Sequence, residues 1–236
     1  MCEKGIKLTL SGSMACFRKP ETNSSQFITF GTIHKVVLCG IFGAVVGFKG
    51  YESCNGNMPE FYEKFKDLKV SIVAEKKNII QQMISFNNAT GIASLEEGGN
   101  LIVNETVLCN PSWDIYVMDD GSDEYNLLKE YLISKRCVYI PYLGRNDYPA
   151  NITNVIEVEF ESIGEEYVVY DSFVKAIASE CKSSDWGRKF FKSEKLPVGL
   201  EENTKHYQYE NFLLTNDLIP LKENSYKCDN KNIAFI

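Results

Sequence analysis

Hydrophobic periodicity predicts six regular elements in the first part of the chain. Apolar side chains recur at helical spacing along residues 33–48, with Thr32 as the expected N-cap, and again along 123–134. Four short runs instead alternate apolar and polar positions, which is typical of strands. These runs are residues 5–11, 69–74, 113–118 and 137–143. The resulting order is strand, helix, strand, strand, helix, strand, which is that of the ferredoxin-like, or split βαβ, topology.

Two further hairpins are predicted around this core. Residues 75–112 are too many for a simple connection and contain a strand-like run at 101–108, so we expect a projecting hairpin. Residues 156–160 alternate with glutamates and are followed, after Gly164, by an apolar run at 167–174, which indicates a second hairpin. The expected division of this α+β chain is a core at 1–145, with its insert at about 75–112, and a C-terminal β-rich extension at 146–236 that ends in an irregular tail.

Composition and charge narrow the classes of function. The 236 residues are 44% hydrophobic and 24% charged, an ordinary globular mixture. The net charge of −7 argues against a general nucleic-acid binder. Residues 1–50, however, contain six Lys and Arg against two Asp and Glu, a local charge of +4, whereas residues 51–184 contain eleven against twenty-two, a local charge of −11. A basic end on an acidic body favours one surface for an anionic ligand.

The cysteines and the apolar segments bear on the compartment. None of the eight cysteines forms a CxxC pair, and no secretory segment is evident, so we expect reduced thiols, no zinc site and a cytoplasmic location. The apolar run at 36–48 has thirteen residues, fewer than the roughly 20 that a membrane span needs. We therefore expect no membrane association.

Three segments carry residues suited to a phosphate or a base. In the loop 17–35, Arg18 and Lys19 follow the first strand, while His34 and Lys35 begin the first helix, whose free N–H groups attract anions. In the turn at 142–150, Gly144 permits a close backbone approach and Arg145 can reach a phosphate. Each segment can equally be a solvated loop. Asn87 and Asn88 can read base edges or cap a turn.

Catalytic signatures are mostly missing. The sequence contains no G-x-S-x-G, P-loop or H-E-x-x-H motif. If the chain were a metal-independent ribonuclease, His34 could act as the base and Lys35 could stabilise the phosphorane. The acidic run at 119–124 does not have EF-hand spacing and favours a turn before a helix. We therefore expect no metal and no cofactor.

Several motifs occur in an order that resembles a known family. These motifs are FRKPETN at 17–23, GTIHKVVLCGIFGAVVGFKGY at 31–51, FNNATG at 86–91, EEGGNLIV at 96–103, NPSWDIYV at 110–117 and PYLGRNDYPA at 141–150. Over about residues 1–175 the chain resembles the Cas-five family of the CRISPR-associated RAMP superfamily, and most closely the subtype I-B kind. The resemblance is most specific at the LGR turn and at the basic loop before the first helix.

The resemblance implies a fold, a function and a set of partners. The implied fold is a ferredoxin-like RAMP core with an inserted β-hairpin thumb at 75–112. The implied role is to hold the 5′ handle of the CRISPR RNA in a type I Cascade complex and to cap its backbone, next to the backbone and large subunits, with target DNA contacted only indirectly. Carried over to this sequence, the handle site would include Arg18, Lys19, His34, Lys35, Gly144 and Arg145.

Two other functions remain open at this point. Subtype I-C relatives cleave the repeat RNA with a Tyr, Lys and His set, so an endoribonuclease is one alternative; the adjacent pair His34 and Lys35 does not match that arrangement. A protein–protein module without RNA contact is the other. It would leave the basic N-terminal loop without an explanation.

Overall fold

The computed structural model describes residues 3–22, 26–53, 57–87, 95, 102–183 and 189–236. Its helices are α1 (Lys35–Val46), α2 (Glu60–Phe65) and α3 (Asp123–Ile133), with 3-10 turns at Tyr51–Ser53 and Ala178–Glu180. Its strands are β1 (Glu3–Ser11), β2 (Met14–Ala15), β3 (Gln26–Phe27), β4 (Val70–Ala74), β5 (Ile80–Asn87), β6 (Ile102–Cys109), β7 (Ser112–Met118), β8 (Asn151–Ser162), β9 (Tyr167–Val168), β10 (Val174–Lys175), β11 (Phe191–Leu200), β12 (Tyr207–Thr215), β13 (Ile219–Pro220), β14 (Ser225–Cys228) and β15 (Lys231–Ala234). The fold is thus mixed α+β and rich in strands.

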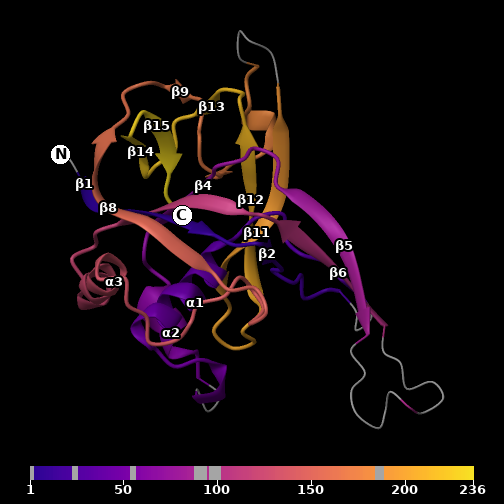
Figure 1. Cartoon of the computed structure of the whole chain (residues 1–236). Coiled ribbons are helices and arrows are strands. Elements are labelled where there is room, and N and C mark those ends of the chain that lie inside the picture. Colours follow the sequence, from indigo (N-terminus) through magenta and orange to yellow (C-terminus); the bar gives the residue numbers. More distant parts are fainter. Residues whose placement is uncertain (1–2, 23–25, 54–56, 88–94, 96–101, 184–188) are drawn as a thin grey trace.

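A six-stranded sheet organises the molecule, in the order β15-β14-β8-β1-β7-β4. β1 lies between two antiparallel partners, with Leu8 opposite Ile115 in β7 and Lys7 opposite Ile156 in β8. All three helices lie on one side of this sheet (Figure 1). The sheet therefore contains strands from both the predicted core at 1–145 and the predicted extension at 146–236.

Strand alternation determines which side chains enter the core. Ile6, Leu8 and Leu10 of β1 are fully buried and belong to the same core cluster as α1 and α3. Burying each such side chain contributes about 1.5–3 kcal/mol. On the opposite face of the sheet, Phe160 of β8 packs against Phe235, which follows β15. The sheet is thus covered on both faces.

The chain also forms two antiparallel ribbons outside the central sheet. β5 pairs with β6 over its whole length, from Ile80 opposite Cys109 to Asn87 opposite Ile102, and this ribbon extends away from the body (Figure 1). The pairing agrees with the hairpin expected within residues 75–112. The other edge of β6 holds β2 and β3.

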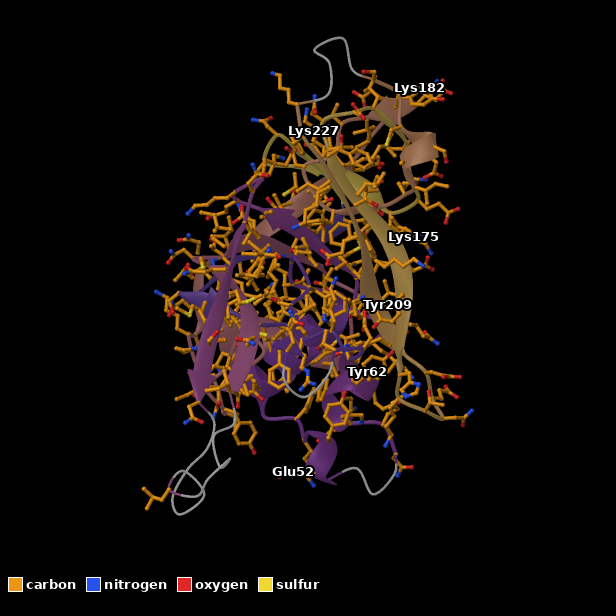
Figure 2. The ribbon with its side chains drawn as sticks, turned by 90° about the vertical axis from the view of Figure 1, so that its right-hand side faces the viewer. Glu52, Tyr62, Lys175, Lys182, Tyr209 and Lys227 are labelled. Carbon is orange, nitrogen blue, oxygen red and sulfur yellow. The ribbon has the colours of Figure 1, made fainter. Side chains whose placement is uncertain are left out.

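The second ribbon is the C-terminal sheet β10-β12-β11. Its strands β11 and β12 are paired from Phe191 opposite Thr215 to Leu200 opposite Tyr207. Beneath it, the Tyr62 hydroxyl of α2 accepts a hydrogen bond from the Leu200 backbone N–H at 2.6 Å (Figure 2). The expectation of an irregular tail was therefore wrong. Some inward-facing positions of these strands carry charged side chains. The apolar and polar residues therefore do not alternate in the sequence as they do in a typical strand.

The strand expected at 137–143 is absent, and β8 occupies the corresponding place beside β1. The backbone N–H groups of Val138 and Tyr139 bond to the carbonyl oxygens of Val45 and Ala44 at the end of α1, both at 2.9 Å. The alternating pattern therefore belongs to a loop along α1. Val138, Tyr139 and Ile140 are exposed, Ile140 at 77%, whereas Leu143 is buried in the core.

Two other expectations are corrected. Residues 156–160 and 167–174 do not form a hairpin, because β8 pairs with β1, β9 with β13 and β10 with β12. The N-cap of α1 is His34 rather than Thr32. The Thr32 hydroxyl instead accepts a hydrogen bond from Nε1 of the buried Trp113 at 3.0 Å. Among the described residues, no helix is long and apolar enough to cross a membrane.

Candidate functional site

A cavity of about 250 Å³ lies where the loop after β2, the β5–β6 ribbon and the turn at 141–150 meet. It is lined by Cys16, Arg18, Phe27, Phe86, Glu105, Gly144 and Arg145. Three of these, Arg18, Gly144 and Arg145, were expected at a binding site from the sequence. The fold brings Arg18 to the other two although it precedes Gly144 by 126 positions in the sequence.

Gly144 allows the two backbone segments of the cavity wall to approach each other closely. Its φ of 88° is in the left-handed region. A Cβ built on Gly144 would overlap the carbonyl oxygen of Cys16, and the Cys16 N–H donates to the Leu143 carbonyl at 3.1 Å. A side chain at residue 144 would therefore push the turn away from the loop.

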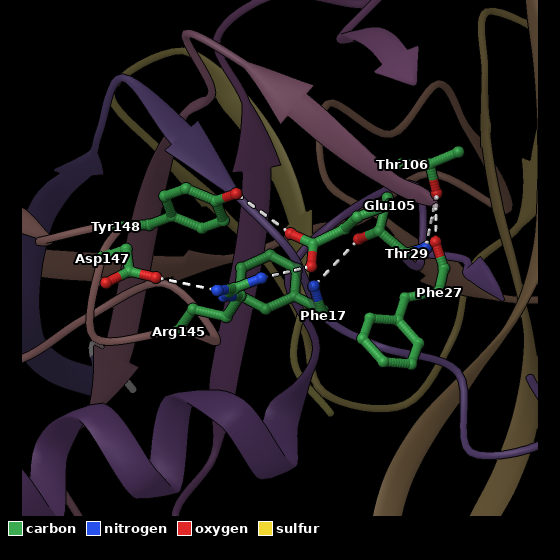
Figure 3. Close-up of polar contacts among 8 residues, drawn as sticks. All are labelled: Phe17, Phe27, Thr29, Glu105, Thr106, Arg145, Asp147 and Tyr148. Atoms are coloured by element: carbon green, nitrogen blue, oxygen red, sulfur yellow. Dashed lines mark hydrogen bonds and ion pairs between the residues drawn. The ribbon is translucent and has the colours of Figure 1, made fainter. Parts of the chain in front are cut away.

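Glu105 and Asp147 hold the guanidinium of Arg145. Nη1 of Arg145 donates to Oε2 of Glu105 at 2.6 Å, and Nη2 donates to Oδ2 of Asp147 at 2.8 Å (Figure 3). Glu105 is only 1% exposed, and its Oε1 accepts a hydrogen bond from the Tyr148 hydroxyl at 3.0 Å. Removing Arg145 would leave the buried Glu105 without its ion-pair partner, which is strongly destabilising.

Burial and Glu105 together keep the neighbouring acids neutral. Burial, assisted by the charge of Glu105, raises the pKa of the Cys16 thiol to about 12. Burial and the hydrogen bond to Glu105 also raise the pKa of Tyr148 to about 12. The cavity wall therefore holds a neutral thiol beside the side chains of Glu105, Arg18 and Arg145.

Arg18 covers the aromatic wall of the cavity. Its guanidinium carbon lies 3.8 Å from the centroid of the Phe27 ring, and Nη2 donates to the Thr22 carbonyl at 3.0 Å. The loop is attached to strand β6 of the ribbon through threonines. The Phe17 N–H donates to Oγ1 of Thr29, and the Thr29 N–H donates to Oγ1 of Thr106, both at 2.9 Å (Figure 3).

Lys19 lies next to this cavity without lining it. Its Nζ is 3.2 Å from Oε1 of Glu194 in β11 and 5.2 Å from the centroid of the Phe30 ring. Glu194 also accepts the Gly31 N–H at 3.0 Å. Lys19 thus joins the loop to the C-terminal sheet.

The placement of His34 at an open phosphate site was wrong. His34 is 1% exposed and its ring packs edge-on against Phe30 and Tyr207. Burial lowers its pKa to about 3, and Nδ1 is buried without a hydrogen-bond partner. The side chain is therefore a neutral core group.

Lys35 is also separated from the cavity. Its Nζ donates to the Ile236 carbonyl at 3.2 Å, and burial lowers its pKa. It points toward the far end of the chain.

The asparagines expected at a site stand at the end of the ribbon. Asn87 is the last residue of β5, opposite Ile102, and Asn88 lies outside the described residues. Sequence reasoning missed Phe27, Phe86 and Glu105. A signal for Glu105 was present, since it alternates with Val103 and Val107 on the buried face of β6. Within the described part of the chain, no cluster of three metal-binding side chains occurs.

Comparisons with known proteins identify the fold. No protein-family model matches the sequence, and no curated protein matches it significantly. Solved structures do match. A chain of a CRISPR RNA-guided surveillance complex aligns with a TM-score of 0.55 and 12% identity, covering 92% of this chain and 91% of that one. A CRISPR protein from Archaeoglobus fulgidus aligns with a TM-score of 0.54 and 10% identity, covering 98% and 97%.

A third match comes from a different kind of CRISPR assembly. A chain of the Type III-B Cmr-beta complex, bound to cognate target RNA and AMPPnP, aligns with a TM-score of 0.54 and 10% identity, covering 91% of this chain and 86% of that one. At these identities the likeness is one of fold. The chain therefore shares its fold with these CRISPR-associated proteins.

Proposed function

We propose that this chain is a CRISPR RNA-binding subunit of a type I, subtype I-B-like, Cascade complex, in which it holds the 5′ handle and caps the backbone in the cytoplasm. The observation that carries this proposal is the convergence of Arg18, Gly144 and Arg145 on one cavity, within a fold that matches CRISPR effector proteins over most of its length. These are the residues that the resemblance assigned to the handle.

The arrangement of strands supports the finer assignment. The order β8-β1-β7-β4, with α1 after β1 and α3 after β7, is the order expected of a ferredoxin-like core. We infer that the β5–β6 ribbon is the thumb and that it contacts the backbone subunit. The large subunit would lie nearby, and target DNA would be contacted only indirectly.

We favour binding over catalysis. The ribonuclease alternative needs His34 as a base, and this imidazole is buried and has no route to a 2′-hydroxyl. The alternative of a pure protein–protein module leaves the cavity and its two arginines without a role.

The test is a binding assay with the full chain and labelled cognate CRISPR repeat RNA, in EDTA, with and without the backbone subunit. We expect intact RNA, bound weakly by the chain alone and tightly in the mixture. The double variant Arg18→Ala, Lys19→Ala should reduce the affinity and flatten its salt dependence, because two positive charges near the RNA are removed.

The matched control removes the same charge elsewhere. Lys175 and Lys227 lie on the C-terminal part of the molecule (Figure 2), and neither lines the cavity. The double variant Lys175→Ala, Lys227→Ala should leave the salt dependence close to that of the wild type. Cleavage that persists in EDTA would refute the binding role, and RNA bound in neither setting would refute both RNA functions.

A further inference from the structure

We propose that the cavity between Phe27 and Phe86 receives a single unstacked nucleobase of the RNA, and not a phosphate group. This inference rests on the proposed function and deepens it. The sequence suggested that Arg145 grips a phosphate. The contacts of Arg145 in the folded chain point to a different ligand chemistry.

The guanidinium of Arg145 is already paired with acidic side chains. Both of its terminal nitrogens are bonded to carboxylates, at 2.6 Å for Glu105 and 2.8 Å for Asp147. Arg145 therefore has neither terminal nitrogen left for the bidentate grip on a phosphate that the sequence suggested. Because Glu105 is buried at the rear of the cavity, an entering phosphate would meet a carboxylate that solvent does not screen.

The walls are suited to a flat, neutral group. Phe27 and Phe86 contribute aromatic rings, and each ring is accompanied by a guanidinium group. The Arg18 carbon lies 3.8 Å from the Phe27 centroid, and the Arg145 carbon lies 5.2 Å from the Phe86 centroid. Aromatic rings and arginine planes are the surfaces on which proteins stack splayed-out RNA bases.

The size of the cavity limits the ligand to one base. Its volume of about 250 Å³ lies below the range of about 300–1,000 Å³ for drug-sized ligands. Gly144 leaves one wall without a side chain, so a ring can approach the backbone there. The fixed pose of Arg145 means that little side-chain entropy is lost when a base enters.

The test is an abasic scan of the bound RNA. Each RNA lacks one base and keeps its sugar and phosphate, and binding is measured with the full chain and the backbone subunit. We expect one position to lose affinity by about 5-fold to 100-fold, the range for a stacked base. Neutralising the adjoining phosphate as a methylphosphonate should cost less than removing the base.

A protein variant links the sensitive position to the cavity. In Phe86→Ala, removing the same base should have almost no further effect, because the stack is already lost. Tyr209→Ala is the aromatic control: Tyr209 lies on β12 (Figure 2), outside the cavity, and the abasic effect should persist in full. Circular dichroism checks that both variants fold, and the scan of the wild type stands without them.

The outcomes separate this inference from the proposed function. RNA that binds tightly but gives a flat abasic scan would overturn the base pocket and leave the RNA-binding role intact. A larger loss from the methylphosphonate than from the abasic site would assign the cavity to a phosphate. If Phe86→Ala instead impaired capture of the backbone subunit while RNA affinity was unchanged, the occupant would be a protein side chain. Absence of all RNA binding would refute the proposed function itself.

Discussion

The turn at Gly144 gives the sharpest test of the structure, through the substitution Gly144→Ala. Two separate penalties apply. An alanine in the left-handed region costs about 1–2 kcal/mol, and φ at this position is 88°. The new Cβ would also overlap the Cys16 carbonyl, which is backbone and can move only with the segment that follows β2; overpacking of this kind costs about 1–3 kcal/mol. The expected loss of unfolding free energy is therefore about 2–5 kcal/mol.

Gly121 provides a matched control. Its φ is 74°, and a Cβ there would meet no atom within 4 Å. Gly121→Ala should therefore show only the backbone penalty, about 1–2 kcal/mol. In a chain of this length, the additional 1–3 kcal/mol at Gly144 would lower the melting temperature by about 2–12 °C relative to the control.

The assay is urea unfolding of the three proteins side by side, with melting temperatures from calorimetry. Equal losses for the two variants would refute the close approach of the turn to the loop at Cys16. Because the displaced turn also carries Arg145, Gly144→Ala should weaken RNA binding as well. Gly121→Ala should leave RNA binding unchanged.

Two further predictions concern buried polar groups. Burial lowers the pKa of His34 from 6.5 to about 3. Between these two pH values the unfolded chain binds a proton at His34 that the folded chain does not. The free energy of unfolding therefore has its full value above pH 6.5 and falls by up to about 1.4 kcal/mol per pH unit toward pH 3. Acid titration of unfolding should show that His34→Phe loses this part of the acid sensitivity, and an unchanged slope would contradict the buried neutral state. Thr32→Val removes the acceptor of the Trp113 N–H and should cost about 1–3 kcal/mol in urea unfolding, whereas a cost near zero would show that the indole has another partner.

The sequence predicted local elements well and distant pairing poorly. β1, β4, β7 and both long helices follow from periodicity, because each buries one face against the common core. The run at 137–143 was wrongly predicted as a strand because it lies on a loop along α1, where Val138, Tyr139 and Ile140 are exposed while Leu143 enters the core. β8 was predicted as a strand but given the wrong partner, since its partners, β1 and β14, lie near the start and the end of the chain.

For the candidate site too, the residues in local motifs were predicted and the contacts between distant segments were not. Arg18, Gly144 and Arg145 were predicted from their motifs, and the fold brings them together. Glu105 was missed because a carboxylate can be assigned to a site only once its partner is known. Its partner, Arg145, is 40 positions away in the sequence. His34 was assigned to the surface because its aromatic neighbours include Tyr207, which no local pattern connects to it.

The central position of β1 has a consequence for how the chain reaches its fold. Lys7 of β1 is paired with Ile156 of β8, so 149 positions separate the two partners. At a synthesis rate of about 5–20 residues per second, β1 emerges roughly 7–30 s before β8 and has one edge unpaired throughout this time. Folding is therefore expected to be slow and to expose an apolar strand on the ribosome. Chaperones or partner subunits present during translation should then raise the yield of folded chain more than they raise its final stability.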